Sequence, residues 1–354
     1  MPHPAITVLV DTYNHERFIE EALVSVMEQD FPASEMEILV VDDGSTDGTP
    51  DIVRKFAPRV RLLRKPNGGQ ASAFNFGIPE ARGEVVAFLD GDDWWARNKV
   101  TRVAETMAAD PSVGIVGHGI ITVQRDGSRQ TEILREGFRF RANTIAGAKL
   151  FRRRKSLLGT SRMTIQLGIL RQIGGVPEQI RVQADEYLFT LAAVLANAEI
   201  LPDALTFYRM HDANSFQLSA GHLPALRNKQ HSLAALAKHL SDQLKARGIA
   251  PNAALAISEI VAAEATQIRL LAEGGWPWEM VKAEIDIYEV VFEEASAPRW
   301  LLKILGLIPG LFMPPRAYYR LRQQLGQSSV YHRLRQRWLP FPKAAHVSRT
   351  SRMG

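Results

Sequence analysis

The first hundred residues alternate short apolar segments with amphipathic ones, and this alternation limits the fold more than any other feature of the chain. Four segments rich in Val, Ile and Leu are predicted to be buried strands: residues 6–10, 38–41, 60–63 and 85–89. Helical spacing of apolar residues follows at about 16–28, from about 49, and at 71–81. Repeated strand–helix units predict a largely parallel sheet with helices on both faces.

Polar clusters follow three of these strands directly, at residues 11–14, 42–47 and 90–93. Ligands of open parallel sheets bind outside the carboxyl ends of the strands. The three clusters are therefore expected to converge on one crevice and to act together.

The acidic residues after the fourth strand are Asp90, Asp92 and Asp93. Several carboxylates cannot all be ionised close together without a counter-cation. Mg²⁺ and Mn²⁺ take oxygen ligands and are commonly shared between carboxylates and substrate phosphates. Either these residues hold such a cation, or they cap a helix that starts near Trp95.

The segment after the second strand has the same two interpretations. Asp42 or Asp43 could accept a hydrogen bond from a base N–H, while Ser45 or Asp47 caps the next helix. Residues 67–70, of sequence NGGQ, form a turn or bring backbone amides close to a phosphate or ribose.

Taken together, five segments resemble the inverting glycosyltransferase family 2 in order and in spacing. They are DTYN at 11–14, VDDGSTD at 41–47, NGG at 67–69, NFG at 75–77 and FLDGDD at 88–93. The resemblance is strong over residues 5–100 and weaker to about residue 215. It implies an α/β fold of the GT-A type, with a mostly parallel central sheet flanked by helices and followed here by a helical C-terminal extension.

The resemblance also implies a nucleotide-sugar site and a metal site. Thr12, Tyr13, Asp43 and Asn67 would line the nucleoside pocket. Asp90 and Asp92 would form the motif for Mn²⁺ or Mg²⁺, with Asp92 the direct ligand. Gly91 replaces a small residue often found there, and this exchange is expected to be harmless. The full expected nucleotide-sugar-binding set is Thr12, Tyr13, Asn14, Asp42, Asp43, Asn67, Gly68, Asp90 and Gly91.

The second half of the domain must supply the catalytic base, because a sugar hydroxyl has to lose its proton as it attacks. The family usually carries an acidic pair before a helix. Ala184 stands at the first acidic position, so Asp185 matches the base and Glu186 is the alternative; Asp185 could also be only a helix N-cap. His211 matches a segment that can place a histidine near the metal or diphosphate, or it has a structural or exposed role.

The chain of 354 residues contains no cysteine, which excludes disulfides, thiolate zinc sites and cysteine nucleophiles. No signal peptide is expected, and no apolar run reaches the length of a transmembrane helix. Three amphipathic helices are predicted at 226–245, 253–272 and 280–291. The expected division is a catalytic domain 1–221 (nucleotide-sugar half 1–100, acceptor half 101–221), a helical region 222–298 and a tail 299–354.

The tail is strongly basic. It holds eleven Lys or Arg and no acidic residue, whereas residues 1–298 hold 32 basic and 38 acidic residues. Its apolar run at 300–313 is broken by Pro309 and is too short to span a bilayer. We expect a cytoplasmic protein that lies peripherally on the cytoplasmic face of an anionic membrane. A basic helix packed on the acidic body is the alternative; the apolar run argues against nucleic acid as a partner.

The sequence thus predicts transfer of a sugar from a nucleotide-diphosphate sugar to a hydroxyl of a glycan or lipid-linked acceptor. A non-catalytic nucleotide-sugar-binding protein is one alternative. A processive polysaccharide synthase is another, because Arg337 and Trp338 resemble the end of its Gln-x-x-Arg-Trp motif. Leu334 stands where that motif has a polar residue, and the spanning helices of such synthases are not predicted.

Overall fold

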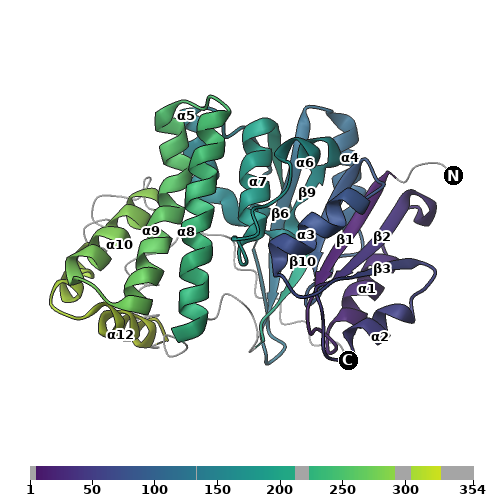
Figure 1. Ribbon diagram of the computed structural model, residues 1–354. Helices are drawn as coiled ribbons and strands as arrows, with labels where there is room; N and C mark the ends of the chain where they lie inside the picture. Colours follow the sequence, from purple (N-terminus) through teal and green to yellow (C-terminus); the bar gives the residue numbers. More distant parts are fainter. Residues whose placement is uncertain (1–4, 133, 212–222, 292–303, 328–354) are drawn as a thin grey trace.

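The computed structural model describes residues 5–132, 134–211, 223–291 and 304–327. Its strands join one mixed sheet (Figure 1): β1 (Ile6–Thr12), β2 (Met36–Asp42), β3 (Val60–Arg64), β4 (Val85–Asp90), β5 (Trp94–Trp95), β6 (Val113–Val123), β7 (Arg129–Thr131), β8 (Phe138–Phe140), β9 (Thr164–Gln166) and β10 (Asn197–Arg209).

The helices of the described residues surround this sheet and extend beyond it. They are α1 (Ile19–Met27), α2 (Thr49–Arg54), α3 (Gln70–Gly77), α4 (Lys99–Ala109), α5 (Ile145–Arg154), α6 (Leu167–Ile173), α7 (Ala184–Leu195), α8 (Leu223–Ala246), α9 (Pro251–Glu273), α10 (Pro277–Val291) and α12 (Pro315–Gln327). Short 3-10 turns are η1 (Ala33–Glu35), η2 (Ile78–Glu80), η3 (Lys155–Leu158), η4 (Thr160–Arg162) and η5 (Ile308–Leu311).

The strand order is β3-β2-β1-β4-β9-β6-β10-β5, with β7 beside β6 and β8 beside β10. All four strands predicted in the first hundred residues are present as β1 to β4, and they pair in parallel. β6 and β10 are also parallel to each other, whereas β9 is antiparallel to both β4 and β6. The predicted α/β fold with a mostly parallel sheet and flanking helices is therefore confirmed.

The two faces of the sheet bury separate cores. On one face, Ile19 and Leu23 of α1 pack with Val8 and Val10 of β1. On the other face, Leu9 packs with Phe74 of α3 and the apolar side of α7. Alternate residues of β1 thus supply both cores, as expected for a strand buried on two faces.

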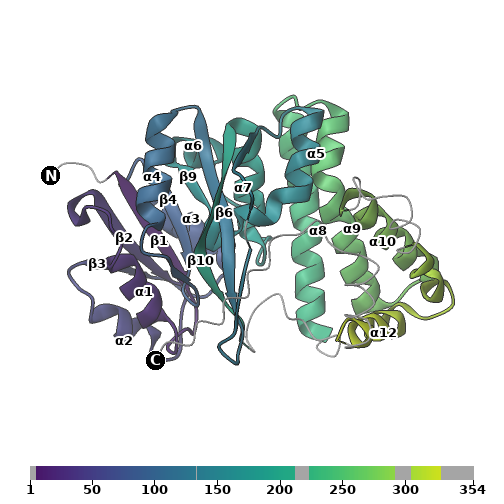
Figure 2. The same ribbon diagram turned by 180° about the vertical axis from the view of Figure 1, so that it is seen from behind.

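The helical extension lies at the end of the molecule far from β1, β2 and β3 (Figures 1 and 2). α8 and α9 pack against each other, α5 packs on α9, and α10 follows α9. The three predicted helices are present, and each extends by a few residues beyond its predicted bounds at one or both ends.

One interpretation of the acidic motif is wrong. No helix starts near Trp95, because Trp94 and Trp95 form β5 and pair antiparallel with Thr206 and Phe207 of β10. The ring of Trp94 stacks on Phe207 with 5.1 Å between centroids. The helix begins only at Lys99, so Asp92 and Asp93 do not cap it.

Part of the predicted tail is described, from residue 304 to residue 327, and it packs on the helical region. Leu307 and Tyr318 are buried against Leu270 and Met280. Arg316 donates hydrogen bonds to the carbonyl oxygens of Leu271 and Ala272, near the carboxyl end of α9. Residues 299–303 and 328–354 lie outside the described residues, and within the described part no helix combines the length and apolarity needed to cross a bilayer.

Candidate active site

The carboxyl ends of β1 and β4 bring acidic side chains together. Asp11 and Asp90 are direct neighbours in the parallel pairing of these strands, so both project from the same face of the sheet. Asp90, Asp92 and Asp93 each offer a carboxylate oxygen within 4.8 Å of the others. The convergence predicted from the strand-end clusters is therefore present.

Asp93 is tied into the protein. Its carboxylate accepts hydrogen bonds from the Ser161 hydroxyl at 2.7 Å and from the backbone N–H of Arg209 at 3.0 Å. Asp90 is held more loosely, with Ser161 Oγ at 3.4 Å and Gln70 Nε2 at 3.5 Å from its oxygens. Burial raises the pKa of both carboxyl groups well above the ordinary value, and neighbouring carboxylates add to this effect.

Asp92 lies beside two histidines. His211 Nε2 is 2.9 Å from Asp92 Oδ2, and His15 Nε2 is 3.9 Å from the same oxygen. Burial alone would raise the pKa of Asp92, but the hydrogen bond from His211 and the charges of the two rings outweigh it and lower that pKa. The structure therefore places His211 against the predicted metal ligand, and its ring packs on Phe18 at 4.7 Å.

Asp11 is a site residue that the sequence reasoning missed. Its Oδ1 is buried and has no hydrogen-bond partner among the residues that the structure describes. Burial is the main cause that raises the pKa of Asp11 to about 8, and the charge of Asp92 is the second. Its position at the end of β1 was readable from sequence, but the neighbour relation of β1 and β4 was not.

The acidic cluster has the chemistry of a site for a hard divalent cation. Its three closest donors are carboxylate oxygens of Asp90, Asp92 and Asp93, which suit Mg²⁺ or Mn²⁺. The orphaned oxygen of Asp11 and the raised pKa of Asp90 both indicate that the cluster lacks a compensating charge. The residues present therefore fit the metal that the sequence predicts.

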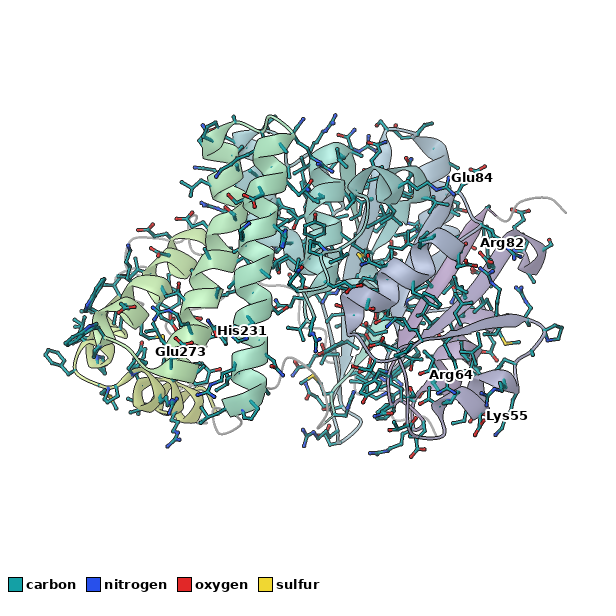
Figure 3. The ribbon with its side chains drawn as sticks, in the orientation of Figure 1. Lys55, Arg64, Arg82, Glu84, His231 and Glu273 are labelled. Atoms are coloured by element: carbon teal, nitrogen blue, oxygen red, sulfur yellow. The ribbon has the colours of Figure 1, made fainter. Side chains whose placement is uncertain are left out.

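In the predicted cluster at residues 42–47, Asp42 is hydrogen-bonded to neighbouring residues. Asp42 is fully buried and bonds to Arg64 Nε at 2.6 Å and to the Ser45 N–H at 2.9 Å. Figure 3 shows Arg64 beside the carboxyl end of the sheet. With both oxygens engaged, Asp42 shapes the loop in this structure.

Asp43 organises the NGG turn. It accepts hydrogen bonds from Lys65 Nζ at 2.7 Å and from the backbone amides of Gly68 and Gly69, the latter at 2.7 Å. Asn67 Nδ2 donates to the backbone carbonyl of Asp43. The carboxylate and the amides predicted to meet the nucleotide thus bond to each other here.

Tyr13 is a predicted pocket residue that faces outward. Its side chain is 44% exposed, whereas Thr12 is buried. Asn14 adopts a left-handed backbone with φ 57°, accepts a hydrogen bond from the Thr46 N–H and donates its own N–H to Ser45 Oγ. This locked turn leaves the Tyr13 ring free to stack on a flat ligand.

Asp185 lies in the first turn of α7 and faces the same cluster. Its Oδ2 accepts hydrogen bonds from the N–H and the hydroxyl of Thr160, both at 3.1 Å. The N-cap of α7 is Gln183, in a left-handed conformation with φ 59°, so Asp185 is not the N-cap. Burial raises the pKa of Asp185, and the charge of Glu186 contributes.

Glu186, the alternative base, is engaged elsewhere. Its buried carboxylate pairs with Lys155 Nζ at 2.5 Å. Burial would lower the pKa of Lys155, but the charges of Glu186 and Glu264 raise it.

A hydrogen-bonded chain joins the metal motif to Asp185. The side chain of Gln70 lies 3.5 Å from Asp90, donates to Thr160 Oγ1 at 3.1 Å and accepts from the Ala184 N–H. Thr160 in turn holds Asp185. Gln70 and Thr160 were not predicted, because their roles depend on the docking of α3, η4 and α7, which are far apart in sequence.

The glycosyl transferase family 2 model matches residues 7–165. An uncharacterized glycosyltransferase of Nostoc sp. is 31% identical over 230 residues, which cover 61% of this chain and 67% of that protein. The chain belongs to glycosyltransferase family 2. Other curated relatives are matched over less than two thirds of their own length, for example 36% for the uncharacterized glycosyltransferase EpsJ of Bacillus subtilis.

Solved structures confirm that this family member has the GT-A type fold. Staphylococcus aureus TarS, in complex with UDP-GlcNAc, superposes with a TM-score of 0.57 at 20% identity, covering 92% of this chain and 93% of that one. The mannosyltransferase PcManGT of Pyrobaculum calidifontis, in complex with GDP-Man and Mn²⁺, gives 0.52 at 23% identity, covering 95% and 88%.

Proposed function

We propose that this family 2 glycosyltransferase moves a sugar from a nucleotide-diphosphate sugar to an acceptor hydroxyl, with inversion at the anomeric carbon. The observation that supports this most is the chain from Asp90 through Gln70 and Thr160 to Asp185. It holds a candidate leaving-group site and a candidate base in one crevice. Inversion requires these two groups on opposite sides of the reacting carbon.

The donor would bind at the carboxyl ends of β1, β2 and β4. Tyr13, Thr12, Asp43 and Asn67 are proposed to contact the nucleoside once the Asp43–amide bonds rearrange. Asn14, Asp42, Gly68 and Gly91 are proposed to shape the loops around it. The bound UDP-GlcNAc of TarS and GDP-Man of PcManGT support a nucleotide-sugar as the class of donor.

Asp92 and Asp90 are proposed to hold Mn²⁺ or Mg²⁺, with His211 in contact with the same site. When bound, the cation neutralises charge that develops on the leaving diphosphate. His211 and His15 would orient Asp92 and add hydrogen-bond donors near the diphosphate. The Mn²⁺ of PcManGT supports this assignment.

Asp185 is proposed as the general base, in preference to Glu186. The raised pKa of Asp185 makes it a stronger proton acceptor than an ordinary aspartate when it is ionised. Glu186 is neutralised by Lys155 and cannot face the acceptor without breaking a buried ion pair.

The acceptor is proposed to be a glycan or lipid-linked hydroxyl on the cytoplasmic face of a membrane. The excess of basic residues in the tail supports this location. The division into 1–221, 222–298 and 299–354 remains our proposal for domain organisation, with the catalytic groups in the first unit.

Two substitutions test the proposal against a panel of UDP-, GDP- and dTDP-sugars with Mn²⁺. Asp92→Asn is expected to reduce metal-dependent turnover by about 10²-fold or more. Asp185→Asn is expected to reduce transfer by about 10²-fold or more while donor affinity is retained. Asp126→Asn, in an exposed turn, is the matched control.

The outcomes separate the alternatives. Full activity of Asp92→Asn, or of wild type in excess chelator, would refute the metal assignment. Activity in Asp185→Asn together with a dead Glu186→Gln would move the base by one residue. If wild type binds donor but releases no nucleoside diphosphate with any acceptor, it is a non-catalytic binder.

A further inference from the structure

Exposed apolar side chains are concentrated at one end of the helical region. Twelve large apolar side chains are exposed among the described residues, and six of them lie in two short segments of this region. These six are Trp276, Trp278, Leu305, Ile308, Leu311 and Phe312, which together are called the apolar patch below. The two most exposed side chains of the patch are aromatic: Phe312 is 81% exposed and Trp276 is 70% exposed.

The two segments lie against each other. Leu307 is buried in the same small core as Met280 and Val281 of α10, and η5 packs on α10. A Cβ at Gly310 would lie only 3.0 Å from Val281 Cγ2. Trp278 precedes Val281 by three residues and therefore lies next to it on the helix surface. The buried sides of both segments share one core, so their exposed apolar side chains lie at the same end of the helical region.

Rigid contacts hold this surface in place. Arg316 binds the carbonyl oxygens of Leu271 and Ala272, which fixes the start of α12 against the end of α9. Figure 3 shows Glu273, the last residue of α9, at this end of the helical region. In Figure 1 the end of α9, α12 and the carboxyl ends of β1 and β6 all point to the lower side of the molecule.

The charges around the patch suit an anionic surface. Lys282, one turn after Trp278, and Arg320 are exposed. Two acids of α10 are paired, Glu279 with Arg269 and Glu284 with Arg322, whereas Glu273 at the end of α9 is exposed. The chain from residue 299 onward, Arg320 included, holds eleven basic residues and no acid. Apolar and aromatic side chains flanked by basic ones are typical of surfaces that bind the membrane interface.

We propose that the apolar patch inserts into the interfacial region of an anionic lipid bilayer, with Trp276 and Trp278 as anchors in addition to the basic tail. The inference rests on the proposed function only in that it identifies the membrane beside which the acceptor would lie. Indole side chains are stable at the boundary between headgroups and acyl chains. The deeper apolar contacts come from Leu311 and Phe312.

The experiment is flotation of the full chain with phosphatidylcholine vesicles that contain or lack phosphatidylglycerol. Wild type is expected to float with the anionic vesicles. The triple variant Trp276→Ser, Trp278→Ser, Phe312→Ser is expected to bind about tenfold or more weakly. Leu255→Ser removes an equally exposed side chain, 63% exposed, outside the patch and is the matched control. Brominated acyl chains are expected to quench tryptophan fluorescence less in the triple variant than in wild type.

Release of nucleoside diphosphate from the donor, measured without vesicles, keeps this test separate from the proposed function. The triple variant is expected to retain that activity and the wild-type melting temperature. Equal flotation of the triple variant and wild type would overturn the inference and leave the tail as the only anchor. Absence of wild-type binding, with a patch-dependent dimer in sedimentation, would overturn it in favour of contact between two copies. Neither result would alter the assignment of Asp92 and Asp185.

Discussion

At the residue scale, the absence of a side chain at Gly91 leaves the space that His15 occupies beside Asp92. A Cβ at position 91 would lie 2.7 Å from Thr12 Oγ1 and 2.8 Å from His15 Nδ1. Thr12 Oγ1 and His15 Nδ1 are themselves 3.1 Å apart and hydrogen-bonded. The family often has a small side chain here, and the sequence interpretation took its loss as harmless. The structure shows that the glycine gives its space to this threonine–histidine pair.

Gly91→Ala is expected to weaken Mn²⁺ and nucleotide binding by about tenfold, because the new methyl group must displace the Thr12–His15 pair from Asp92. Isothermal titration calorimetry measures both affinities. His15→Ala in the same chain is expected to recover part of the loss, so the two substitutions are not additive.

Gly168→Ala is the matched control, since a Cβ there meets nothing within 4 Å. It should leave both affinities unchanged. If Gly91→Ala binds Mn²⁺ and nucleotide as tightly as wild type does, the loop adjusts to the methyl group and the position of His15 beside Asp92 does not matter for binding.

The candidate site could be predicted in part because ligand-binding residues of parallel sheets lie directly after the carboxyl ends of the strands. The positions of Asp90 and Asp92 after β4 were readable from the alternation of apolar and polar segments. Asp11 belongs to the cluster predicted at the same edge, but its pairing with Asp90 and the place of His15 were not readable, because the sequence does not state that β4 lies next to β1. Ser161 and Thr160 were missed for a similar reason: η4 docks under the acidic motif from 70 residues away, and its sequence resembles an ordinary loop.

At the scale of elements, a buried cluster of charged side chains connects residues 101–221 with the helical region. Lys155 in η3 pairs with Glu186 of α7, and the charge of Glu264 of α9 also acts on Lys155. Burial raises the pKa of Glu264, with Lys155 opposing the shift. The element that carries Asp185 is therefore braced electrostatically by the segment after α5 and by α9.

Lys155→Met is expected to destabilise the fold by about 3–5 kcal/mol, because it leaves Glu186 charged and buried without its partner. Urea unfolding followed by circular dichroism measures the change. Lys155→Met combined with Glu186→Gln is expected to lose less than the sum of the single losses.

Lys238→Met serves for comparison, since its pair with Asp242 is exposed and should contribute little. Equal small effects of both lysine substitutions would mean that water reaches the Lys155–Glu186 pair.

The long elements were predictable and the short ones were not. α8 and α9 carry many turns of apolar periodicity, so their existence followed from sequence. β5 and β9 have two and three residues, too few for any period to be recognised. One of the two alternatives for the acidic motif consequently placed the start of a helix near Trp95, whereas Trp94 and Trp95 pair with β10 as a strand.

At the scale of the whole molecule, the buried carboxyl groups with raised pKa values should make the free energy of unfolding depend on pH. Asp11 has an ordinary pKa of 3.8 when unfolded and about 8 when folded. Between these values the folded chain holds a proton that the unfolded chain has lost, so the stability contributed by this group falls as pH rises through that window. The raised pKa values of Asp90 and Asp93 act in the same direction.

In the presence of chelator, wild type is expected to lose up to about 1.4 kcal/mol of unfolding free energy more than Asp11→Asn for each pH unit in this window. Urea titrations from about pH 5 to about pH 8, within this window, measure the difference. Mn²⁺ should restore more stability to wild type at the upper end. Parallel pH profiles of the two proteins would show that Asp11 titrates normally.

β9 has a consequence for recombining this enzyme with its relatives. Although it comes 74 residues after the end of β4, it lies between β4 and β6: Thr164 and Ile165 pair with both strands, and Gln166 pairs with β4. A chimera with its junction near residue 100 would take β4 from one parent and the strand that covers its edge from another. A junction just after Gln166 keeps the paired strands β4 and β9 within one parent, together with Thr160 and Ser161. Exchange of donor preference between relatives should therefore be attempted with the longer block.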